Sequence, residues 1–434
     1  MGETRRENCN TIIELRGGSN IVGTAHCHGE YSDPKGGISV ALSTQQLLYL
    51  NVLMNDDLLC TGAPATVGEF ARRLLEDGSA DKARTILENI LSDDCLREMR
   101  IIRADCEDWG AGYCVFADGS DEAVVAFRGT TSGLEWYDNF VAANQADSAH
   151  QAAARKYLEG LDLSGYETVT LTGHSKGGNK AMYCAVVSDI ADRCVAFDGQ
   201  GFSDEFMTKY ADRIADRRSR IENHSAGGDY INVLLNSVGE SRYYETFNPT
   251  DNFFLNHELT AMCDEAGQMH PGEQEAGAKE FAAFANSLLK SLPAARRDST
   301  LDFLGKAAAL ILKGDTAVAG ADDLSALIRQ RKYRKEITYL LGYIIRYERE
   351  TGTPIKTLRK IIANPRVSAV FQEIGDKLLD LLEWQAKNPL AAWGVASGIN
   401  FLVEDAEWSY ILGLISDAEW LSARLDAMPA YISA

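Results

Sequence analysis

The stretch that decides the fold is residues 168–187, TVTLTGHSKGGNKAMYCAVV. Its first part is β-branched and apolar, which is typical of a buried strand, and the part from Asn179 onward has helical character. Between them lies the pentapeptide Gly173-His174-Ser175-Lys176-Gly177. A serine on a sharp turn from strand to helix has a strained backbone, and Gly173 and Gly177 remove Cβ atoms that would clash beside it. The stretch therefore predicts a nucleophile elbow, with Ser175 as the nucleophile.

An oxyanion that forms during attack by such a serine needs hydrogen-bond donors. The helix after Ser175 points its positive end toward the site, and the amide of Lys176 is one candidate donor. The second donor is expected from the turn after an earlier strand, where residues 123–127 run into Gly129 and Thr130. The amide and hydroxyl of Thr130 are the candidates there, and an ordinary strand end with a buried Arg128 is the alternative. The ammonium group of Lys176 is expected to point into solvent from the first turn of the helix, and a positive charge near the mouth of the site is the alternative.

A general base must be a histidine within hydrogen-bonding reach of Ser175, and α/β-hydrolases order their site residues as Ser, acid, His along the chain. Three histidines follow the elbow, namely His224, His257 and His270. His257 comes after the last predicted strand and is the favoured base. His224 lies in or just after the preceding strand and His270 in a predicted loop, so both remain alternatives.

The acid that orients the base has two main candidates. Asp229, in the segment AGGDYI, follows the strand before that of His257 and is the favoured acid. Asp198 follows the strand immediately after the elbow helix, a position that some hydrolases use, and is the alternative acid. An Asx turn with Gly199 is the structural interpretation of Asp198. Asp251 is a third candidate and is more typical of a turn residue.

Two further segments carry a resemblance to known families. Residues 126–130, AFRGT, followed by Glu135-Trp136 and Asp138-Asn139-Phe140, resemble the F-R-G-[ST] … D-W … D-[LF] signature of class-3 lipases. The elbow and residues 197–203, FDGQGFS, are similar to a bacterial lipase-like family catalogued as domain of unknown function 2974, with Gln200 in place of that family's proline. The resemblance covers about residues 38–290 and implies an α/β-hydrolase fold with a Ser-Asp-His esterase site. His257-Glu258 matches that family's histidine position before a helix.

The pattern of the whole chain agrees with a sheet covered by helices. Strands alternating with helices imply a largely parallel sheet with both faces covered. We therefore expect an irregular segment over residues 1–37, an α/β-hydrolase domain over 38–293 and a helical region over 294–434. The predicted helices are 39–59, 67–76, 82–102, 150–161 and 179–190, and the predicted strands are 112–116, 123–127, 167–171, 193–197, 220–225 and 243–247.

Composition narrows the class of protein. The formal net charge of -20 over 434 residues argues against nucleic acid as a partner, because a phosphate backbone would be repelled. Nine cysteines without regular spacing are typical of reduced thiols. The N-terminus lacks the apolar region of a secretory signal, and the longest apolar stretch, 390–403, is too short to span a bilayer. We expect a cytoplasmic protein.

One segment departs from the acidic balance of the chain. Residues 329–360 hold ten Lys or Arg against three Glu, around the apolar run 337–345. A basic amphipathic element of this kind can contact anionic lipid at a membrane surface or an acidic protein. A packed helix with a solvated basic face is the alternative interpretation.

These residues together predict hydrolysis of a carboxylic ester, such as an acyl lipid or a small-molecule ester, by Ser175, His257 and Asp229. An amidase or peptidase with the same residues is an alternative, and so is a catalytically silent binding or scaffold protein with a hydrolase fold. No cofactor is expected. His26-Cys27-His28 has metal-binding residue types but no matching cluster nearby, so no metal site is predicted.

Overall fold

The computed structural model describes residues 29–32, 38–54, 65–78, 83–106, 112–119, 121–130, 138–139, 142–248, 253–312, 326–327 and 330–352. The chain divides into two compact units, Met1–Ser43 and Thr44–Ala434. Within the first unit, strand β1 (Gly29–Ser32) pairs antiparallel with β2 (Ile38–Ala41). This hairpin was not predicted, and the helix predicted over 39–59 is wrong at its start, because residues 38–41 are extended. The domain boundaries at 37 and 293 stay predictions.

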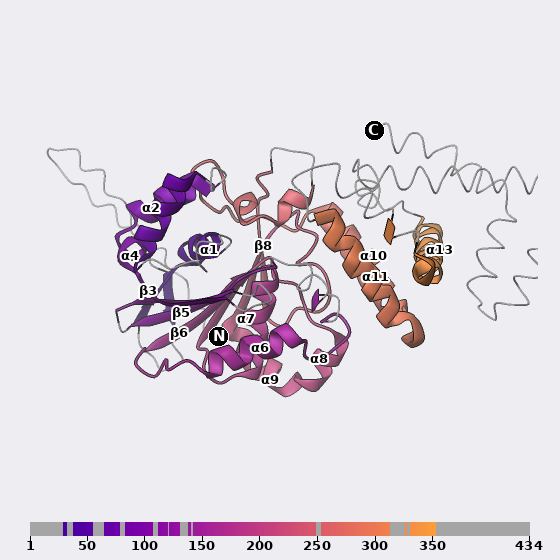
Figure 1. The fold of residues 1–434 in the computed structure, drawn as a ribbon, viewed down its shortest axis with the longest axis horizontal. Helices are drawn as coiled ribbons and strands as arrows, with labels where there is room; N and C mark the ends of the chain where they lie inside the picture. Colours follow the sequence, from indigo (N-terminus) through magenta and orange to yellow (C-terminus); the bar gives the residue numbers. More distant parts are fainter. Residues whose placement is uncertain are drawn as a thin grey trace, which may run out of the picture. The chain divides into compact units, whose positions relative to one another are not determined.

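The second unit is built on a seven-stranded mixed sheet in the order β3-β4-β5-β6-β7-β8-β9. The first three strands run antiparallel to one another, and the pairs from β5–β6 to β8–β9 are parallel. The sheet is thus mostly parallel and flanked by helices (Figure 1). The strands are β3 (Arg100–Cys106), β4 (Gly112–Asp118), β5 (Glu122–Phe127), β6 (Thr168–His174), β7 (Arg193–Phe197), β8 (Ile221–Ala226) and β9 (Glu240–Tyr244).

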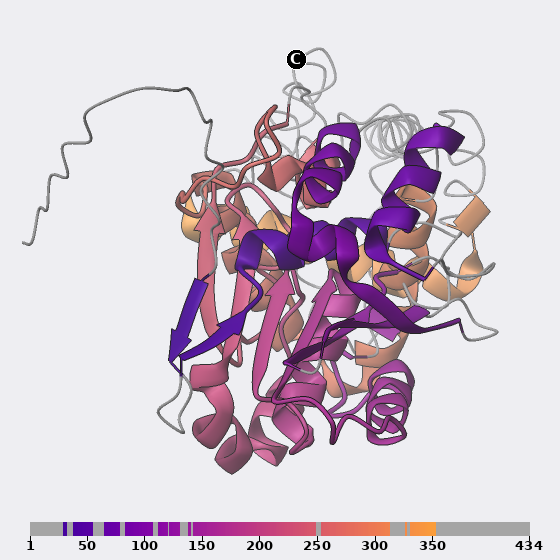
Figure 2. The same cartoon turned by 90° about the vertical axis from the view of Figure 1, so that its left-hand side faces the viewer.

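Figure 1 shows α1, α2 and α4 on one side of the sheet and α6 and α9 on the other, and Figure 2 gives the same layers from the side. The described α-helices that precede β8 are α1 (Thr44–Leu53), α2 (Val67–Asp77), α3 (Arg84–Ser92), α4 (Asp94–Glu98), α6 (Ala149–Glu159), α7 (Lys176–Val187), α8 (Asp204–Lys209) and α9 (Ala211–Arg217). The sequence patterns did not predict α8 and α9.

Strand β6 explains how the central strands become buried on both faces. Val169 and Leu171 belong to the apolar core that includes residues of α6 and α7. Thr172, which alternates with them, donates its hydroxyl proton to the Val195 carbonyl at 2.7 Å and accepts from Asn51 of α1 at 2.7 Å. Because successive strand residues face opposite sides, β6 is held by α1 on one face and by α7 on the other.

The helix predicted over 82–102 is wrong in its second half. Asp93 ends α3 and caps α4, since its carboxylate accepts from the amides of Cys95 and Leu96 at 3.0 and 3.1 Å. The chain then leaves the helix, and residues from Arg100 onward pair with β4 as the edge strand β3. An N-cap aspartate has an extended backbone, which interrupts the helix at Asp93. Pairing with β4 then outweighs the weak helical pattern of the residues that follow α4.

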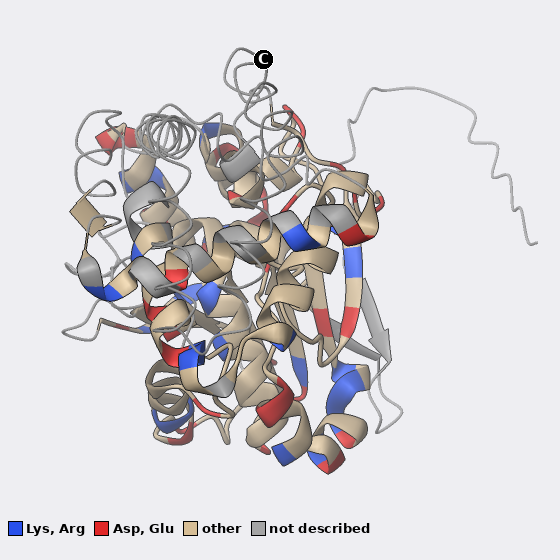
Figure 3. Ribbon diagram, turned by 90° about the vertical axis from the view of Figure 1, so that its right-hand side faces the viewer, with Lys and Arg blue, Asp and Glu red and all other residues tan. Residues whose placement is uncertain are grey.

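The described part of the C-terminal region is helical, with α10 (Ala276–Ser291), α11 (Ala294–Leu312) and α13 (Arg334–Thr351). Tyr339 and Tyr343 of α13 pack against Phe284 and Leu288 of α10, and the Tyr343 and Ser287 hydroxyls lie 2.6 Å apart. The apolar side of the basic segment is therefore occupied by a neighbouring helix. Figure 3 is viewed from the side on which Figure 1 places α10 and α13, and it shows basic and acidic residues interspersed there. Residues 353–360 of the basic segment lie outside the described residues, and its membrane or protein contact stays a prediction.

The structure bears on membrane-spanning helices and on the oxidation state of the cysteines. No helix among the described residues is long and apolar enough to cross a membrane. Reduced thiols are confirmed at Cys95, Cys114, Cys184, Cys194 and Cys263. The same expectation is wrong at Cys106, which is disulfide-bonded. The cytoplasmic location stays a prediction.

Candidate active site

Ser175 lies on a strained turn between β6 and α7. Its backbone has φ 57° and ψ -122°, a region that non-glycine residues rarely adopt. A Cβ atom on Gly177 would lie 1.9 Å from the carbonyl oxygen of Phe127, and one on Gly173 would lie 2.2 Å from the carbonyl carbon of Gly177. The close approach of three backbone segments thus requires glycine at both positions. The serine side chain is carried at the tip of this turn, where α7 begins.

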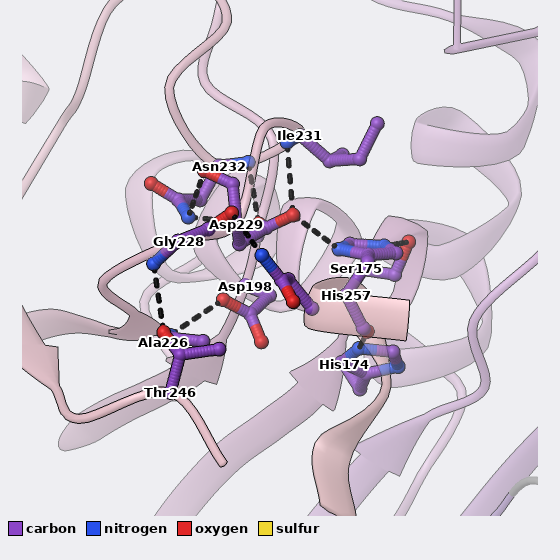
Figure 4. A network of polar contacts seen from close by, with 12 residues as sticks. His174, Ser175, Asp198, Ala226, Gly228, Asp229, Ile231, Asn232, Thr246 and His257 are labelled. Atoms are coloured by element: carbon purple, nitrogen blue, oxygen red, sulfur yellow. Dashed lines mark hydrogen bonds and ion pairs between the residues drawn. The ribbon is translucent and has the colours of Figure 1, made fainter. Parts of the chain in front are cut away.

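A hydrogen-bonded chain joins Ser175 to His257 and Asp229 (Figure 4). Nε2 of His257 lies 2.8 Å from Oγ of Ser175, and Nδ1 of His257 lies 3.0 Å from Oδ1 of Asp229. The His257 side chain is 18% exposed and that of Asp229 is 2% exposed. The imidazole therefore has one nitrogen directed at the serine and the other at a buried carboxylate.

The other two downstream histidines have different partners. Nδ1 of His224 lies 2.8 Å from the hydroxyl of Tyr244, and its Nε2 lies 3.3 Å from Glu222. Nε2 of His270 lies 2.8 Å from Asp264. The structure thus brings His257, and not these alternatives, to Ser175.

Asp229 follows β8 and is surrounded by donors. Its carboxylate accepts from the amides of Ile231 and Asn232 at 3.0 and 2.9 Å, and from the Asn232 side chain at 2.7 Å. Burial alone would raise the pKa of Asp229, but the charge and hydrogen bond of His257, together with the two amides, lower it below its usual range. Asp229 is therefore an anion fixed beside the imidazole.

Asn256 holds the loops of His257 and Asp229 together. Its side-chain amide donates to the carbonyl oxygen of Gly228 at 2.9 Å. A Cβ atom on Gly228 would lie 2.7 Å from that same amide nitrogen. The residue before His257 is thus hydrogen-bonded to the residue before Asp229, which fixes the spacing of these two side chains.

Asp198, the alternative acid, directly follows β7 and is wholly buried at a φ of 46°. Its Oδ1 accepts from the amide of Ala226 at 3.0 Å. Among the described residues, the carboxylate that receives a hydrogen bond from His257 is that of Asp229. The third candidate, Asp251, lies outside the described residues.

Gly129 lies directly against the elbow, and Thr130 follows it in the chain. A Cβ atom on Gly129 would be 3.1 Å from the carbonyl oxygen of His174 and 3.7 Å from Cβ of Ser175. The hydroxyl of Thr130 accepts from the side-chain amide of Asn139 at 3.2 Å. The predicted oxyanion turn is thus next to Ser175, and the amide of Lys176 opens helix α7 on the other side.

The expectation that the Lys176 side chain points into solvent is wrong. The side chain is fully buried, and its Nζ lies 2.6 Å from Oδ2 of Asp138. Asp138 also accepts from the hydroxyl of Ser148 at 2.6 Å, and Ser148 forms the capping box of α6 with Gln151. Burial raises the pKa of Asp138, but the charge and hydrogen bond of Lys176 bring it below its usual range. This ion pair ties residues 138–139, and through Asn139 the hydroxyl of Thr130, to the start of α7.

His174 is a site residue that the sequence did not reveal. Its Nε2 lies 2.8 Å from the carbonyl oxygen of His257, and the two rings are 4.9 Å apart. Burial, together with the charge of His257, lowers the pKa of His174 to about 3. The ring is therefore neutral, and Nε2–H donates to the carbonyl. The variable position of a G-x-S-x-G pattern carries no signal for such a contact.

One ligand atom each from His174, Asp198 and His257 lies within 4.8 Å of the others. These residues are not arranged as a metal site. Both ring nitrogens of His257 bind Ser175 and Asp229, and Nε2 of His174 binds the His257 backbone. His26-Cys27-His28 lies outside the described residues.

The arrangement has the parts that nucleophilic acyl transfer needs. A hydroxyl lies beside an imidazole nitrogen, a carboxylate lies beside the opposite nitrogen, and the amide of Lys176 follows the serine at the start of α7.

Comparison with known proteins agrees with a lipase-like relationship. Residues 104–243 match the model of the Mbeg1-like family, which is lipase-like. The match includes Thr130, Ser175, Asp198 and Asp229 and ends before His257. No relative with a curated description matches the chain. Among solved structures, that of M37 lipase aligns over 44% of this chain and 70% of its own, with a TM-score of 0.29 and 16% identity. Residues 104–243 are thus similar to a lipase-like family.

Proposed function

We propose that this protein is a serine hydrolase with an α/β-hydrolase fold, which cleaves a carboxylic ester through an acyl-enzyme intermediate. The observation that carries the proposal is the 2.8 Å contact between Ser175 Oγ and His257 Nε2 on a strained strand-to-helix turn. A vestigial site in a scaffold protein need not keep both the strained turn and this contact.

In the proposed mechanism, His257 takes the hydroxyl proton of Ser175 while Oγ attacks the ester carbonyl carbon. Asp229 fixes the tautomer of His257 and stabilises the imidazolium that forms. The amides of Thr130 and Lys176 donate to the oxyanion of the tetrahedral intermediate. The imidazolium then gives its proton to the departing alkoxide, which leaves as an alcohol. The acyl group remains bonded to Oγ of Ser175.

The second half repeats these roles with water. His257 removes a proton from water, the hydroxide adds to the acyl carbon, and the collapse of the second tetrahedral intermediate returns the proton to Oγ of Ser175. The products are a carboxylic acid and the free enzyme. An acyl lipid as the natural substrate stays a prediction.

The test compares hydrolysis of p-nitrophenyl butyrate by the wild type, Ser175→Ala and Ser92→Ala. Ser92 is an exposed serine whose hydroxyl binds the Glu88 carbonyl, so it is a matched control. We expect Ser92→Ala to match the wild type and Ser175→Ala to lose on the order of 10⁴–10⁶-fold in kcat. Equal rates in all three proteins would remove Ser175 as the nucleophile.

The matched anilide, butyryl-p-nitroanilide, separates an esterase from an amidase. Both substrates deliver the same acyl group to Ser175, so they differ only in the leaving group. An esterase cleaves the ester far faster than the anilide, whereas an amidase or peptidase cleaves the anilide with comparable kcat/KM.

A further inference from the structure

Two carboxyl groups stand at the same edge of the sheet behind the candidate base. Asp198 follows β7 and Asp229 follows β8, and these neighbouring strands are parallel, with Phe197 paired to His224. The exposed fractions of Asp198 and Asp229 are 0% and 1%. Asp198 holds a left-handed backbone, which a non-glycine residue keeps only when its surroundings fix it. Figure 4 shows both side chains in the network around His257.

Hydrogen-bond donors are divided very unequally between the two groups. Asp229 receives bonds from His257, from the amides of Ile231 and Asn232 and from the Asn232 side chain. Asp198 accepts from the amide of Ala226 to Oδ1 at 3.0 Å, and a hydrogen bond from the Asn232 side chain also acts to lower its pKa. Its Oδ2 is buried, and no N–H or hydroxyl donor among the described residues bonds to it. A buried carboxylate oxygen without a donor is costly, and a proton on that oxygen removes the cost.

The titratable groups around Asp198 offer no cation to offset a second negative charge. His174 on β6 and His224 on β8 have pKa values lowered chiefly by burial, so both are neutral. His257 is engaged with Asp229. Asp229 itself is the nearest charge, and its carboxyl is within hydrogen-bonding reach of that of Asp198. Burial, and then the charge of Asp229, raise the pKa of Asp198 well above its usual range.

We infer that Asp198 is a positioning residue: a neutral carboxylic acid whose Oδ2–H donates a hydrogen bond to the Asp229 carboxylate and holds it toward His257. The proton of the reaction moves between Ser175, His257 and the leaving group, and Asp198 keeps its own. The kinetic part of this inference rests on the proposed function, and its thermodynamic part does not.

The kinetic test compares Asp198→Asn, Asp198→Ala and Asp229→Asn on p-nitrophenyl butyrate. An asparagine at 198 keeps an acceptor for Ala226 and a neutral donor for Asp229, whereas alanine keeps neither. We expect losses in kcat/KM of less than about tenfold for Asp198→Asn, on the order of 100-fold for Asp198→Ala and about 10⁴-fold for Asp229→Asn. A loss for Asp198→Asn as large as that for Asp229→Asn would overturn the inference.

The pH profile gives a readout that a merely structural role would not move. The acidic limb of kcat/KM reports ionisation of the base in the free enzyme. Because a neutral Asp198 adds no charge, the limb of Asp198→Asn should coincide with that of the wild type. If Asp198 were ionised, the substitution would remove an anion beside the imidazolium and move the limb to lower pH.

The thermodynamic test is urea unfolding of the wild type and Asp198→Asn across pH. A group whose folded pKa is raised binds a proton in the native state that the unfolded state has lost above about pH 3.9, so its contribution to stability declines as pH rises. Asp198→Asn lacks this term, and its free energy of unfolding should increase relative to the wild type from about pH 4 toward neutrality. The opposite slope would identify an ionised Asp198 and overturn the inference.

The proposed esterase function and the inferred neutral state of Asp198 can be contradicted independently of each other. If the wild type shows no esterase activity, the proposed function fails while the unfolding test still decides the state of Asp198. If Asp198→Asn does not fold, the infrared spectrum of the wild type decides it. A carboxylic acid C=O band that persists at neutral pH supports the inference, and the absence of any such band contradicts it.

Discussion

The His174 side chain is hydrogen-bonded to the backbone of His257, with His174 Nε2 lying 2.8 Å from the His257 carbonyl oxygen. The residue before Ser175 thus fixes the loop that carries His257. His174 and His257 come from β6 and from the 3-10 helix η4 (Phe253–His257), which are distant in sequence. This bond links the two elements directly, beside the contact between Ser175 and His257.

The buried, neutral state of His174 predicts acid sensitivity of the fold. Because its pKa is about 3 in the folded state and about 6.5 when unfolded, the native state binds fewer protons between these values. Stability contributed by His174 is therefore present above about pH 6.5 and is lost as pH falls toward 3, with a slope of up to about 1.4 kcal/mol per pH unit. Urea unfolding of His174→Gln should show a flatter dependence over this range. An unchanged slope would contradict a neutral His174.

The elbow glycines should not tolerate a methyl group. Gly177→Ala places a Cβ atom 1.9 Å from the Phe127 carbonyl oxygen, so the helix or the strand must move. We expect a loss of at least about 2 kcal/mol in the free energy of unfolding. Gly165→Ala is the control, since nothing lies within 4 Å of its Cβ position. Chemical unfolding measures both variants, and equal stabilities would show that the turn is looser than described.

The buried ion pair of Lys176 and Asp138 should behave as a coupled unit. Lys176→Met leaves a carboxylate buried without its cation, and we expect a loss of about 3–5 kcal/mol. Adding Asp138→Leu removes that carboxylate and should recover part of the loss, which a double-mutant cycle by urea unfolding measures. Additive losses would mean that the 2.6 Å contact carries no interaction energy.

The sequence predicted the elbow well because its chemistry is local. Strand, glycines, serine and helix are contiguous, so Ser175 and its turn could be placed without tertiary information. His257 and Asp229 followed from chain order, and the structure brings both to Ser175 through hydrogen bonds of 2.8 and 3.0 Å.

The misses have non-local causes. The Lys176 side chain is buried because Asp138, far upstream, is folded against it. Strand β3 forms because β4 offers an edge for pairing, which the local pattern of residues 100–106 does not encode. The contrasting states of Asp198 and Asp229 depend on donors from residues 226, 231 and 232 that only the folded loop assembles.

The most direct measurement of the central claim is covalent trapping of the nucleophile with a fluorophosphonate. Intact-mass and peptide mapping should find one adduct, on Ser175, because an activated serine attacks phosphorus and expels fluoride. His257→Ala should slow its formation and Ser175→Ala should abolish it. A protein that hydrolyses the ester but carries no adduct on Ser175, or a Ser175→Ala variant that is labelled as fast as the wild type, would contradict the account.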